Sequence, residues 1–463
     1  MVNKGGYPPQ IEKIIQSNCA VSGCHNSASK QAAGGINLES WQSLFEGSNS
    51  GSPVIPFSSR FSPLMYFINT YPELGLQATP VMPLNRPPLS KEEVQTIRSW
   101  INNGARDRDG NVKWSEPRRK KLYVANQGCD VITVLDAETG LPIRAVQVGI
   151  KSGNDAPHQI RVSPDGEFWY VIFVNSNFMQ KFRCSDDSFV GDVPLTPYAG
   201  GLTTDPSQNA QDWNAFVISA DGKKAFCTSW TQNGKISVVD LENRRFIKWL
   251  GGQHFPHGIV LSKAGDKLYV TAQTGNFITE LDTGLTGAEQ IPLESVLNYN
   301  SSLDPHDMVL SENGEELLIT CQKSNDVRVL DLNSKTVKAI VKTGEYPQEI
   351  VYARQTGKYY VSCTSDTTTV SGANGVITSF DASSYSVSHI RCGYQPHGIA
   401  VNELTSTLYV LSRNVAQSGV PPHHGSICNG RNGFLNIVDL NTFTVKPGAF
   451  ELSVDPYFII ARP

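Results

Sequence analysis

One sequence pattern recurs along most of this chain and restricts the folds that it can adopt. The repeated unit begins Pro-His-x-Ile-x-Val-Ser, passes a turn, continues with Leu-Tyr-Val, and ends in a strand that closes with Val-Leu-Asp or a similar triplet. From about Pro117 onward, short alternating strands are separated by Asp-Gly, Asn-Gly and related turns, with no strong amphipathic helix. Such regular units predict a repeat architecture. Full or partial copies begin at Pro157, Trp213, Pro256, Pro305, Pro347 and Pro396.

The two ends of this region supply a seventh copy. The segment Asp455-Pro-Tyr-Phe-Ile-Ile460 has the pattern of a first strand without a second, and Lys120–Ala125 has that of a second strand without a first. We expect them to pair, because a ring closed between the chain ends has no exposed sheet edges to invite aggregation. The sequence therefore predicts a closed ring of seven four-stranded sheets. An Asp that follows an apolar pair marks most copies, at Asp136, Asp240, Asp282, Asp331, Asp381 and Asp439.

Nearly all of residues 117–463 resembles the seven-bladed β-propellers built from the Tyr-Val-Thr-Asn type of repeat. The motif occurs here as Tyr123-Val-Ala-Asn126 and in part as Tyr269-Val-Thr271. The resemblance implies an all-β propeller domain over residues 111–463, closed between its N- and C-terminal strands. It specifies the fold far better than the function, because many unrelated proteins use the same fold.

A second motif lies near the start of the chain. In Cys19-Ala-Val-Ser-Gly-Cys24-His25, two thiols are followed at once by an imidazole. Each thiol can add across a vinyl group of haem, and the adjacent histidine is then placed beneath the ring as an axial iron ligand. The usual spacing has two residues between the cysteines, and here there are four. A small disulfide loop and a zinc half-site are the rival interpretations, although the next sixty residues offer no further Cys or His to complete a zinc site.

Helical patterns flank this motif, and one loop offers a second axial ligand. Ile11, Ile14 and Ile15 recur at helical spacing before Cys19, and a capping box at Ser90–Glu93 opens a second apolar helical face. Met82, in Pro80-Val-Met-Pro83, lies in a loop that its prolines hold extended, so its thioether can be directed at iron. Met65 is the alternative, but it falls in a stretch that is typical of a packed helix. Met82 could also simply fill the core.

Residues 7–106 resemble the monohaem c-type cytochrome domains that are fused to larger bacterial periplasmic or surface proteins. The resemblance rests on Asn18-Cys19, Cys24-His25, Ala33-Gly-Gly35, Met82-Pro83, and Leu89–Ser90 through Trp100–Ala105. It implies one covalent haem c, with thioether bonds to Cys19 and Cys24 and axial ligation of the iron by His25 and Met82. It also implies a small all-α domain over residues 1–110, joined to the propeller by a linker at about 107–117.

The repeats also align a set of histidines. The position after the opening Pro of each copy holds His158, Asn214, His257, His306, Gln348, His397 and Tyr457. Because the innermost strand of each blade begins at the mouth of the central channel, these side chains should converge on one axis. His158, His257, His306 and His397 could there hold a transition metal or a second haem. A water-filled channel lined by polar side chains inherited through duplication is the alternative interpretation.

The remaining features restrict partners and location. The formal charge of −4 is spread over the chain, which argues against nucleic acid or an anionic membrane as a partner. No apolar run is long enough to span a bilayer. Haem is attached to c-type cytochromes outside the cytoplasm, so we expect a periplasmic or cell-surface protein whose targeting segment is absent from this sequence. The other seven cysteines do not suggest a disulfide framework. His423 and His424, in the insertion at 415–432, could cap the channel, bind metal or form a rigid surface loop.

These observations favour electron transfer over catalysis. One haem would carry single electrons, while the propeller docks a redox partner protein. The alternative is an oxidoreductase in which the haem feeds a metal or second haem held by the histidine ring. Phosphate-binding loops, nucleophile elbows and zinc-protease helices are not evident in the sequence.

Overall fold

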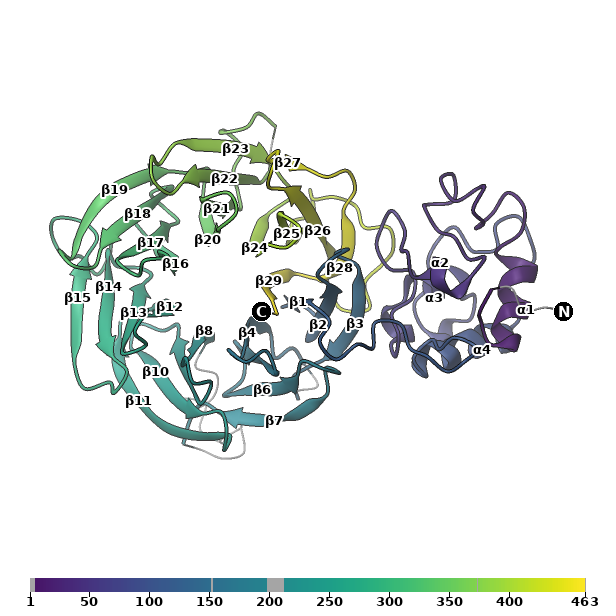
Figure 1. The fold of residues 1–463 in the computed structure, drawn as a ribbon, viewed down its shortest axis with the longest axis horizontal. Helices are drawn as coiled ribbons and strands as arrows, with labels where there is room; N and C mark the ends of the chain where they lie inside the picture. Colours follow the sequence, from purple (N-terminus) through teal and green to yellow (C-terminus); the bar gives the residue numbers. More distant parts are fainter. Residues whose placement is uncertain (1–4, 151–152, 198–211, 373, 463) are drawn as a thin grey trace.

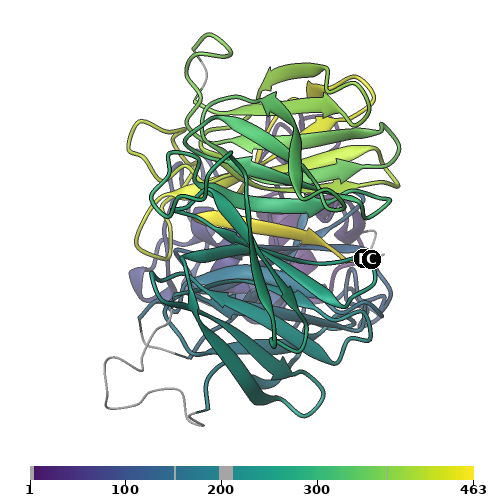
Figure 2. The ribbon, with the colours of Figure 1, turned by 90° about the vertical axis from the view of Figure 1, so that its left-hand side faces the viewer.

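The computed structural model describes residues 5–150, 153–197, 212–372 and 374–462. Seven antiparallel sheets are arranged as the blades of a ring, and an N-terminal segment lies beside one part of its rim (Figure 1). Figure 2 views the ring edge-on, from the side opposite this segment. The prediction of a seven-bladed β-propeller is confirmed.

Each blade contains at least four strands, and its innermost strand faces the ring axis. Blade 1 consists of β29 (Pro456–Ala461), β1 (Lys121–Asn126), β2 (Val131–Asp136) and β3 (Pro142–Gln147). Blade 2 consists of β4 (Pro157–Val162), β5 (Phe168–Phe173), β6 (Phe178–Arg183) and β7 (Phe189–Pro194). Blade 3 consists of β8 (Trp213–Ile218), β9 (Lys224–Ser229), β10 (Gly234–Asp240) and β11 (Arg245–Gln253). Blade 4 consists of β12 (Pro256–Leu261), β13 (Lys267–Ala272), β14 (Phe277–Asp282) and β15 (Ala288–Pro292).

The other three blades continue the ring. Blade 5 consists of β16 (Pro305–Leu310), β17 (Glu316–Cys321), β18 (Asp326–Asp331) and β19 (Thr336–Lys342). Blade 6 consists of β20 (Pro347–Ala353), β21 (Lys358–Cys363), β22 (Val376–Asp381) and β23 (Val387–Arg391). Blade 7 consists of β24 (Pro396–Asn402), β25 (Thr407–Ser412), β26 (Asn432–Asp439) and β27 (Thr444–Val445), with β28 (Phe450–Val454) also paired to β26.

The ring closes where the sequence predicted. β29, from the end of the chain, pairs antiparallel with β1, and Ile459 lies opposite Val124. Both side chains are buried in the core between blades 1 and 7. The closing strand therefore gives β1 a hydrogen-bonded inner neighbour.

The same backbone irregularity recurs at the start of the innermost strand in all seven blades. The residue before each strand has a left-handed backbone, with φ between 41° and 59°, at Ala156, Asp212, Phe255, Asp304, Tyr346, Gln395 and Asp455. Directly after the first residue of each strand, the pairing with the second strand shifts register. A bulge of this kind redirects the side chain that it displaces. The displaced residues include the predicted histidines.

The predicted Asp markers end the third strand of six blades. Each carboxylate accepts hydrogen bonds from backbone N–H groups of the following turn, as Asp240 does from Asn243 and Asp381 does from Ser383 and Ser384. These bonds favour the charged form and lower the pKa of Asp240 to about 2. The turns are therefore fixed locally, by the Asp side chain itself.

The predicted all-α domain in residues 1–110 is wrong. The N-terminal segment holds four short α-helices, α1 (Pro9–Asn18), α2 (Trp41–Leu44), α3 (Pro63–Ile68) and α4 (Lys91–Asn102), and two 3₁₀ turns, η1 (Ser59–Phe61) and η2 (Pro72–Leu74). The expected helices at α1 and α4 are present, including the capping box at Ser90 and Glu93. Between them, most of the segment is loop and turn, because Gly, Pro, Ser and Asn are frequent there.

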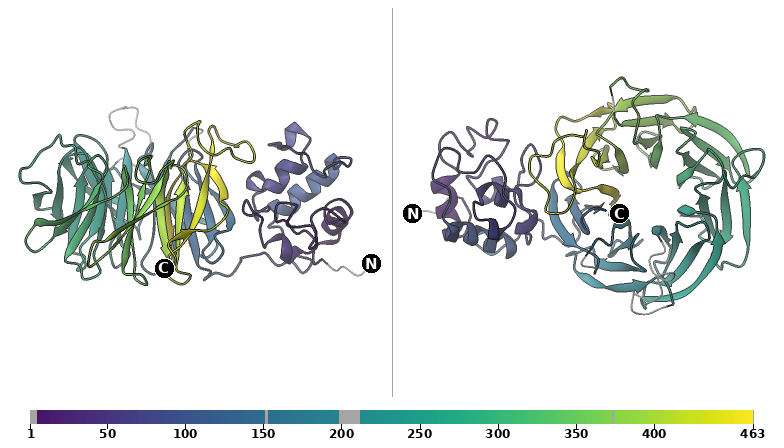
Figure 3. Two further views of the ribbon diagram at one scale, coloured as in Figure 1. Left: turned by 90° about the horizontal axis from the view of Figure 1, so that it is seen from above. Right: turned by 180° about the vertical axis from the view of Figure 1, so that it is seen from behind.

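The N-terminal segment also lacks a core of its own. Its buried side chains form one apolar cluster with those of blades 1 and 2, from Tyr7 and Trp100 through Trp114 to Ile143 and Trp169. Seen from above, the segment lies against the rim of the ring (Figure 3). Its apolar surface is therefore completed by the propeller.

One disulfide joins distant parts of the propeller, which the sequence did not predict. Cys129 follows β1, Cys428 lies in the long insertion before β26, and their Cα atoms are 5.5 Å apart. Cys184, Cys227, Cys321, Cys363 and Cys392 are free and buried. Among the described residues, no helix has both the length and the apolar character needed to cross a membrane.

Candidate functional site

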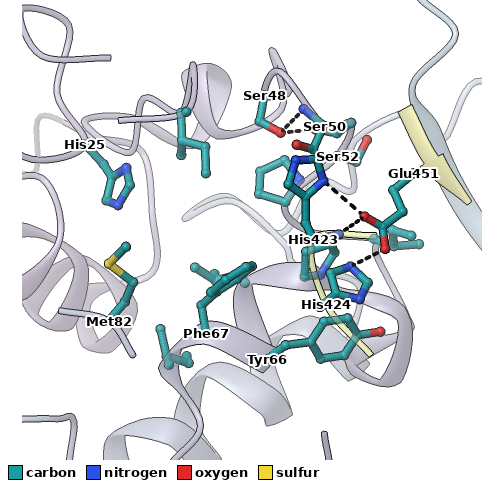
Figure 4. Close-up of a pocket in the computed structure, with 18 of the residues that line it drawn as sticks. His25, Ser48, Ser50, Ser52, Tyr66, Phe67, Met82, His423, His424 and Glu451 are labelled. Carbon is teal, nitrogen blue, oxygen red and sulfur yellow. Dashed lines mark hydrogen bonds and ion pairs between the residues drawn. The ribbon is translucent and has the colours of Figure 1, made fainter. Parts of the chain in front are cut away.

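A cavity of about 470 Å³ lies between the N-terminal segment and the propeller. Cys19, Cys24, His25 and Met82 all line it, although 57 residues separate His25 from Met82 in the sequence. His25 and Met82 face each other across one end of the cavity (Figure 4). The structure thus brings all four predicted haem-site residues together. Apolar side chains form much of the remaining wall, among them Ile36, Ile55, Leu64, Phe67 and Ile68.

The cysteine motif folds into a compact turn after α1. The backbone N–H of Cys24 donates to the carbonyl of Val21 at 3.0 Å, and that of His25 donates to the carbonyl of Cys19 at 3.1 Å. The wider spacing of the thiols is thus accommodated within one tight loop. Cys19 is buried, and burial raises the pKa of its thiol to about 12.

The His25 ring is held ready to act as a neutral ligand. The backbone carbonyl of His25 accepts a hydrogen bond from the backbone N–H of Leu38 at 2.9 Å, which anchors the residue at the cavity wall. Burial lowers the pKa of the imidazole, which favours the neutral form that metals bind. Among the described residues, Nδ1 of His25 is buried without a hydrogen-bond partner. A buried ring nitrogen of this kind suits a side chain that contacts a bound group.

Met82 is presented to the cavity by its loop, whereas Met65 is not. The backbone N–H of Met82 donates to the carbonyl of Phe67 at 2.8 Å, which ties the loop to α3. The Met82 side chain is half-buried and lines the cavity. Met65 lies in α3, is 5% exposed, and packs in the apolar cluster that the segment shares with the propeller. The geometry therefore favours Met82 over Met65 as a side chain that can reach a bound group.

The propeller contributes a polar cluster to the other end of this cavity. Glu451, whose side chain is 5 % exposed, accepts hydrogen bonds from Nδ2 of Asn432 at 2.7 Å and from the backbone N–H of His423 at 2.9 Å. Nε2 of His424 lies 3.4 Å from the same carboxylate, and the His424 ring packs edge-on against Tyr66. His423 and His424 thus face this cavity rather than the channel (Figure 4). The sequence offered no signal that this insertion would meet the N-terminal segment.

The insertion is held in place by the Cys129–Cys428 disulfide. We expect the double substitution Cys129→Ser and Cys428→Ser to lower the free energy of unfolding by about 2–4 kcal/mol, because the bond closes a very long loop. Urea denaturation of the oxidised protein and of the variant measures this difference. A reducing agent should destabilise the natural protein and leave the variant unchanged. Equal stabilities of the two proteins would mean that the bond contributes nothing.

A second cluster surrounds the propeller axis. The aromatic rings displaced by the bulges contact one another in sequence around it: His158 and His257, then His257 and His306, then His306 and His397, with centroid distances of 6.1, 4.1 and 5.9 Å. Tyr457 completes the circle between His397 and His158, at 3.8 and 4.3 Å. The predicted convergence of these side chains is therefore observed. It does not by itself indicate a ligand.

Hydrogen bonds between blades fix the orientation of this cluster. A hydroxyl on the second strand of one blade donates to the bulge carbonyl of the next, as Thr271 does to His306 at 3.2 Å and Thr320 does to Gln348 at 2.7 Å. Burial lowers the pKa of all four histidines, to about 4 for His257. The rings are thus neutral at pH 7, and their nitrogens remain available as acceptors or ligands.

Comparison with known proteins identifies the fold alone. No protein-family model matches the chain, and no curated protein matches it. Among solved structures, a functionally unknown protein from Desulfotomaculum acetoxidans is 13% identical with a TM-score of 0.53, over 74% of this chain and 98% of its own. A candidate 6-phosphogluconolactonase from Bacteroides uniformis is 12% identical with a TM-score of 0.52, over 74% and 100%. A Kuenenia stuttgartiensis hydrazine synthase chain is 18% identical with a TM-score of 0.49, over 64% and 79%.

Proposed function

We propose that this protein carries one covalently attached haem and transfers single electrons, with the propeller as the scaffold that docks a redox partner protein. The observation that carries the proposal is the gathering of Cys19, Cys24, His25 and Met82 on one largely apolar cavity. Cofactor sites typically enclose a few hundred Å³ and are lined mostly by apolar groups with a few placed polar ones. This cavity has that character.

The residues present fit a haem of the c type. Cys19 and Cys24 would supply two thioether links, and His25 and Met82, facing each other, would supply a nitrogen and a sulfur axial ligand. The bound haem would supply a reversible one-electron couple at iron. The protein's own part is to hold Cys19, Cys24 and His25 on one loop and Met82 on another, to exclude water with the apolar wall, and to place the Glu451 cluster at the far end of the cavity.

Substitution of the attachment cysteines tests the proposal. When the protein is produced in a host that matures c-type cytochromes, we expect its haem to remain attached after denaturation, and Cys19→Ala combined with Cys24→Ala to abolish that attachment. Haem staining of denaturing gels and the pyridine haemochrome spectrum measure the result. Cys392→Ala, at a buried free thiol in the propeller, is the matched control and should keep full attachment. Absence of covalent haem in the natural protein would overturn the proposal.

Substitution of the axial methionine separates ligation from attachment. We expect Met82→Ala to keep the covalent haem, to remove the thioether-to-iron charge-transfer absorption of the oxidised protein, and to lower the reduction potential, since methionine ligation raises it. Met65→Leu, in the packed helix α3, should leave the charge-transfer absorption and the reduction potential unchanged. If Met65→Leu removed the absorption and Met82→Ala did not, the ligand assignment would be wrong.

The location of the protein is part of the same proposal. Because covalent haem attachment takes place outside the cytoplasm, we propose that the protein acts in the periplasm or at the cell surface. The Cys129–Cys428 disulfide supports this location, because structural disulfides persist in oxidising compartments.

A further inference from the structure

We propose that the propeller axis binds one divalent transition-metal ion through His306, Glu349 and His397. These residues come from the innermost strands of three consecutive blades, β16, β20 and β24. One potential ligand atom from each lies within 4.8 Å of the other two. This site is separate from the haem cavity, and the proposal does not depend on the haem.

The spacing of the three ligand atoms suits a metal after small adjustments. Bonds from zinc to imidazole nitrogen and carboxylate oxygen measure about 2.0–2.2 Å, so two ligands of a tetrahedral ion lie about 3.3–3.6 Å apart. The three ligand atoms lie within 4.8 Å of one another, so they must approach by at most about 1.5 Å. Rotation of the Glu349 side chain, which is 14% exposed, can supply the adjustment. Its exposure also leaves a route for an ion to enter from the channel.

One ring nitrogen in the cluster is without a partner. Among the described residues, Nε2 of His306 is buried and makes no hydrogen bond. His306 itself is 3% exposed, so water does not readily satisfy that nitrogen. A buried polar atom left unpaired is unfavourable, so such an atom usually marks the position of a partner. Coordination of a metal ion would provide it.

The other histidine is oriented as a ligand by its backbone contact. Nδ1 of His397 donates to the carbonyl of Tyr457 at 3.0 Å, because a carbonyl oxygen can only accept, and the same nitrogen lies 3.9 Å from Oε1 of Glu349. In the neutral ring this leaves the lone pair on Nε2. Metal-binding histidines usually donate their second nitrogen to a carbonyl or carboxylate in this way. For His306, a half-turn of the Gln273 amide, 3.4 Å from Nδ1, would present its oxygen to that nitrogen for the same purpose, with loss of the 3.3 Å hydrogen bond that Gln273 donates to Gln322.

Charged groups of both signs lie near the cluster. Glu349 and Asp307 are half-buried carboxyl groups close to each other, and Arg161 and Arg413 are nearby positive charges, of which Arg413 is paired with Asp455. Burial and the Asp307 charge raise the pKa of Glu349. Two imidazoles and one carboxylate form a donor set typical of zinc and related metals rather than of Ca²⁺ or Mg²⁺.

The remaining histidines of the ring serve other purposes. Nδ1 of His257 donates to the backbone carbonyl of His306 at 3.2 Å, and Nδ1 of His158 bonds the amide of Gln127 at 2.9 Å while its ring packs on Tyr457. The His257 ring packs against the His306 ring, and the His158 ring packs against the His257 ring, so both support the site from one side. The sequence suggested a site of four histidines. The proposed site keeps two of them, His306 and His397, and adds the carboxylate of Glu349, which the repeat alignment did not single out.

Titration of the full-length, metal-free protein with Co²⁺ tests the proposal. We expect one equivalent to bind with visible ligand-field absorption, and Zn²⁺ to displace it. His306→Gln, His397→Gln and the near-isosteric Glu349→Gln should each weaken binding by at least about tenfold. The double variant His423→Ala, His424→Ala is the matched control, because its histidine–carboxylate cluster lies at the other site. It should bind Co²⁺ as the natural protein does.

Thermal denaturation guards against misfolded variants. Zn²⁺ should raise the melting temperature of the natural protein and of Cys19→Ala, Cys24→Ala, but not that of Glu349→Gln. Failure of the natural protein to bind Co²⁺ or Zn²⁺ stoichiometrically would overturn the proposal, as would unchanged affinity in Glu349→Gln with the fold intact. Because haem attachment is scored separately, failure of one proposal leaves the other standing.

Discussion

Deletion of residues 455–463 is expected to prevent the propeller from folding to a stable state. These residues contain β29, which buries Tyr457 and Phe458 in the cluster shared with blades 1 and 2, and Ile459 in the core between blades 1 and 7. Loss of a large buried side chain costs about 2–5 kcal/mol, so the sum approaches the whole stability of a typical domain, about 5–15 kcal/mol. The deletion also exposes the edge of β1, a strand that is buried along its full length. Circular dichroism and size-exclusion chromatography should reveal unfolded or aggregated protein.

A milder substitution tests the same closure without removing backbone. Ile459→Ala, at a side chain 3% exposed, should lower the free energy of unfolding by about 2–5 kcal/mol. Ile340→Ala, on the outer strand β19 with the side chain 51% exposed, should change it by no more than about 0.5 kcal/mol. Similar effects of the two substitutions would show that the β1–β29 contact does not hold the ring together.

The propeller was predictable because each blade repeats the same local sequence pattern. A Pro that opens the strand, an apolar alternation and an Asp that fixes the turn recur at equivalent positions. A copy with a weak pattern can therefore be assigned from the copies with a clear one. The closure was predictable for a similar reason, since an incomplete first copy and an incomplete last copy complement each other. The bulge that directs His306 and His397 to the axis follows from the same repeated pattern.

The N-terminal segment was less predictable because its core is shared. Helical periodicity correctly marks α1 and α4. The intervening loops carry no such pattern, and an all-α domain was inferred from the two ends. A segment that completes its core against Ile143 and Trp169 of a neighbouring unit leaves no local sign of that contact. The resulting error concerned the architecture of the segment, not the identity of its clustered residues.

In the candidate sites, too, only residues marked by the local sequence could be predicted. Cys19, Cys24 and His25 lie within seven consecutive residues, and Met82 is flanked by prolines, so chemistry and local pattern suffice to select them. Glu451 and the Cys129–Cys428 bond depend on contacts between distant segments. Glu349 follows the aligned repeat position by one residue, and only the bulge brings its carboxylate near two histidines.

Substitution of Lys121 by Met is expected to destabilise the propeller by about 3–5 kcal/mol, because it leaves the buried carboxylate of Asp187 without its ion-pair partner. Nζ of Lys121 donates to Oδ2 of Asp187 and to the carbonyl of Cys184, each at 2.8 Å, and both charged side chains are 3% exposed. This contact joins β1 to the turn between β6 and β7, and so links blades 1 and 2. Urea denaturation at pH 7 measures the loss. Lys267→Met, which breaks a partly exposed pair with Glu280, should cost no more than about 1 kcal/mol.

A second substitution identifies the stranded charge as the cause. Asp187→Asn, added to Lys121→Met, should restore most of the lost stability, because the neutral amide can still accept from Nε1 of Trp169 and tolerates the left-handed backbone at φ 61°. Burial already raises the pKa of Asp187, and loss of the ammonium group should raise it further. The folded state of Lys121→Met would then hold a proton more tightly than the unfolded chain. Its stability relative to the natural protein should therefore fall as the pH rises through that pKa, and a pH-independent deficit would point instead to lost packing.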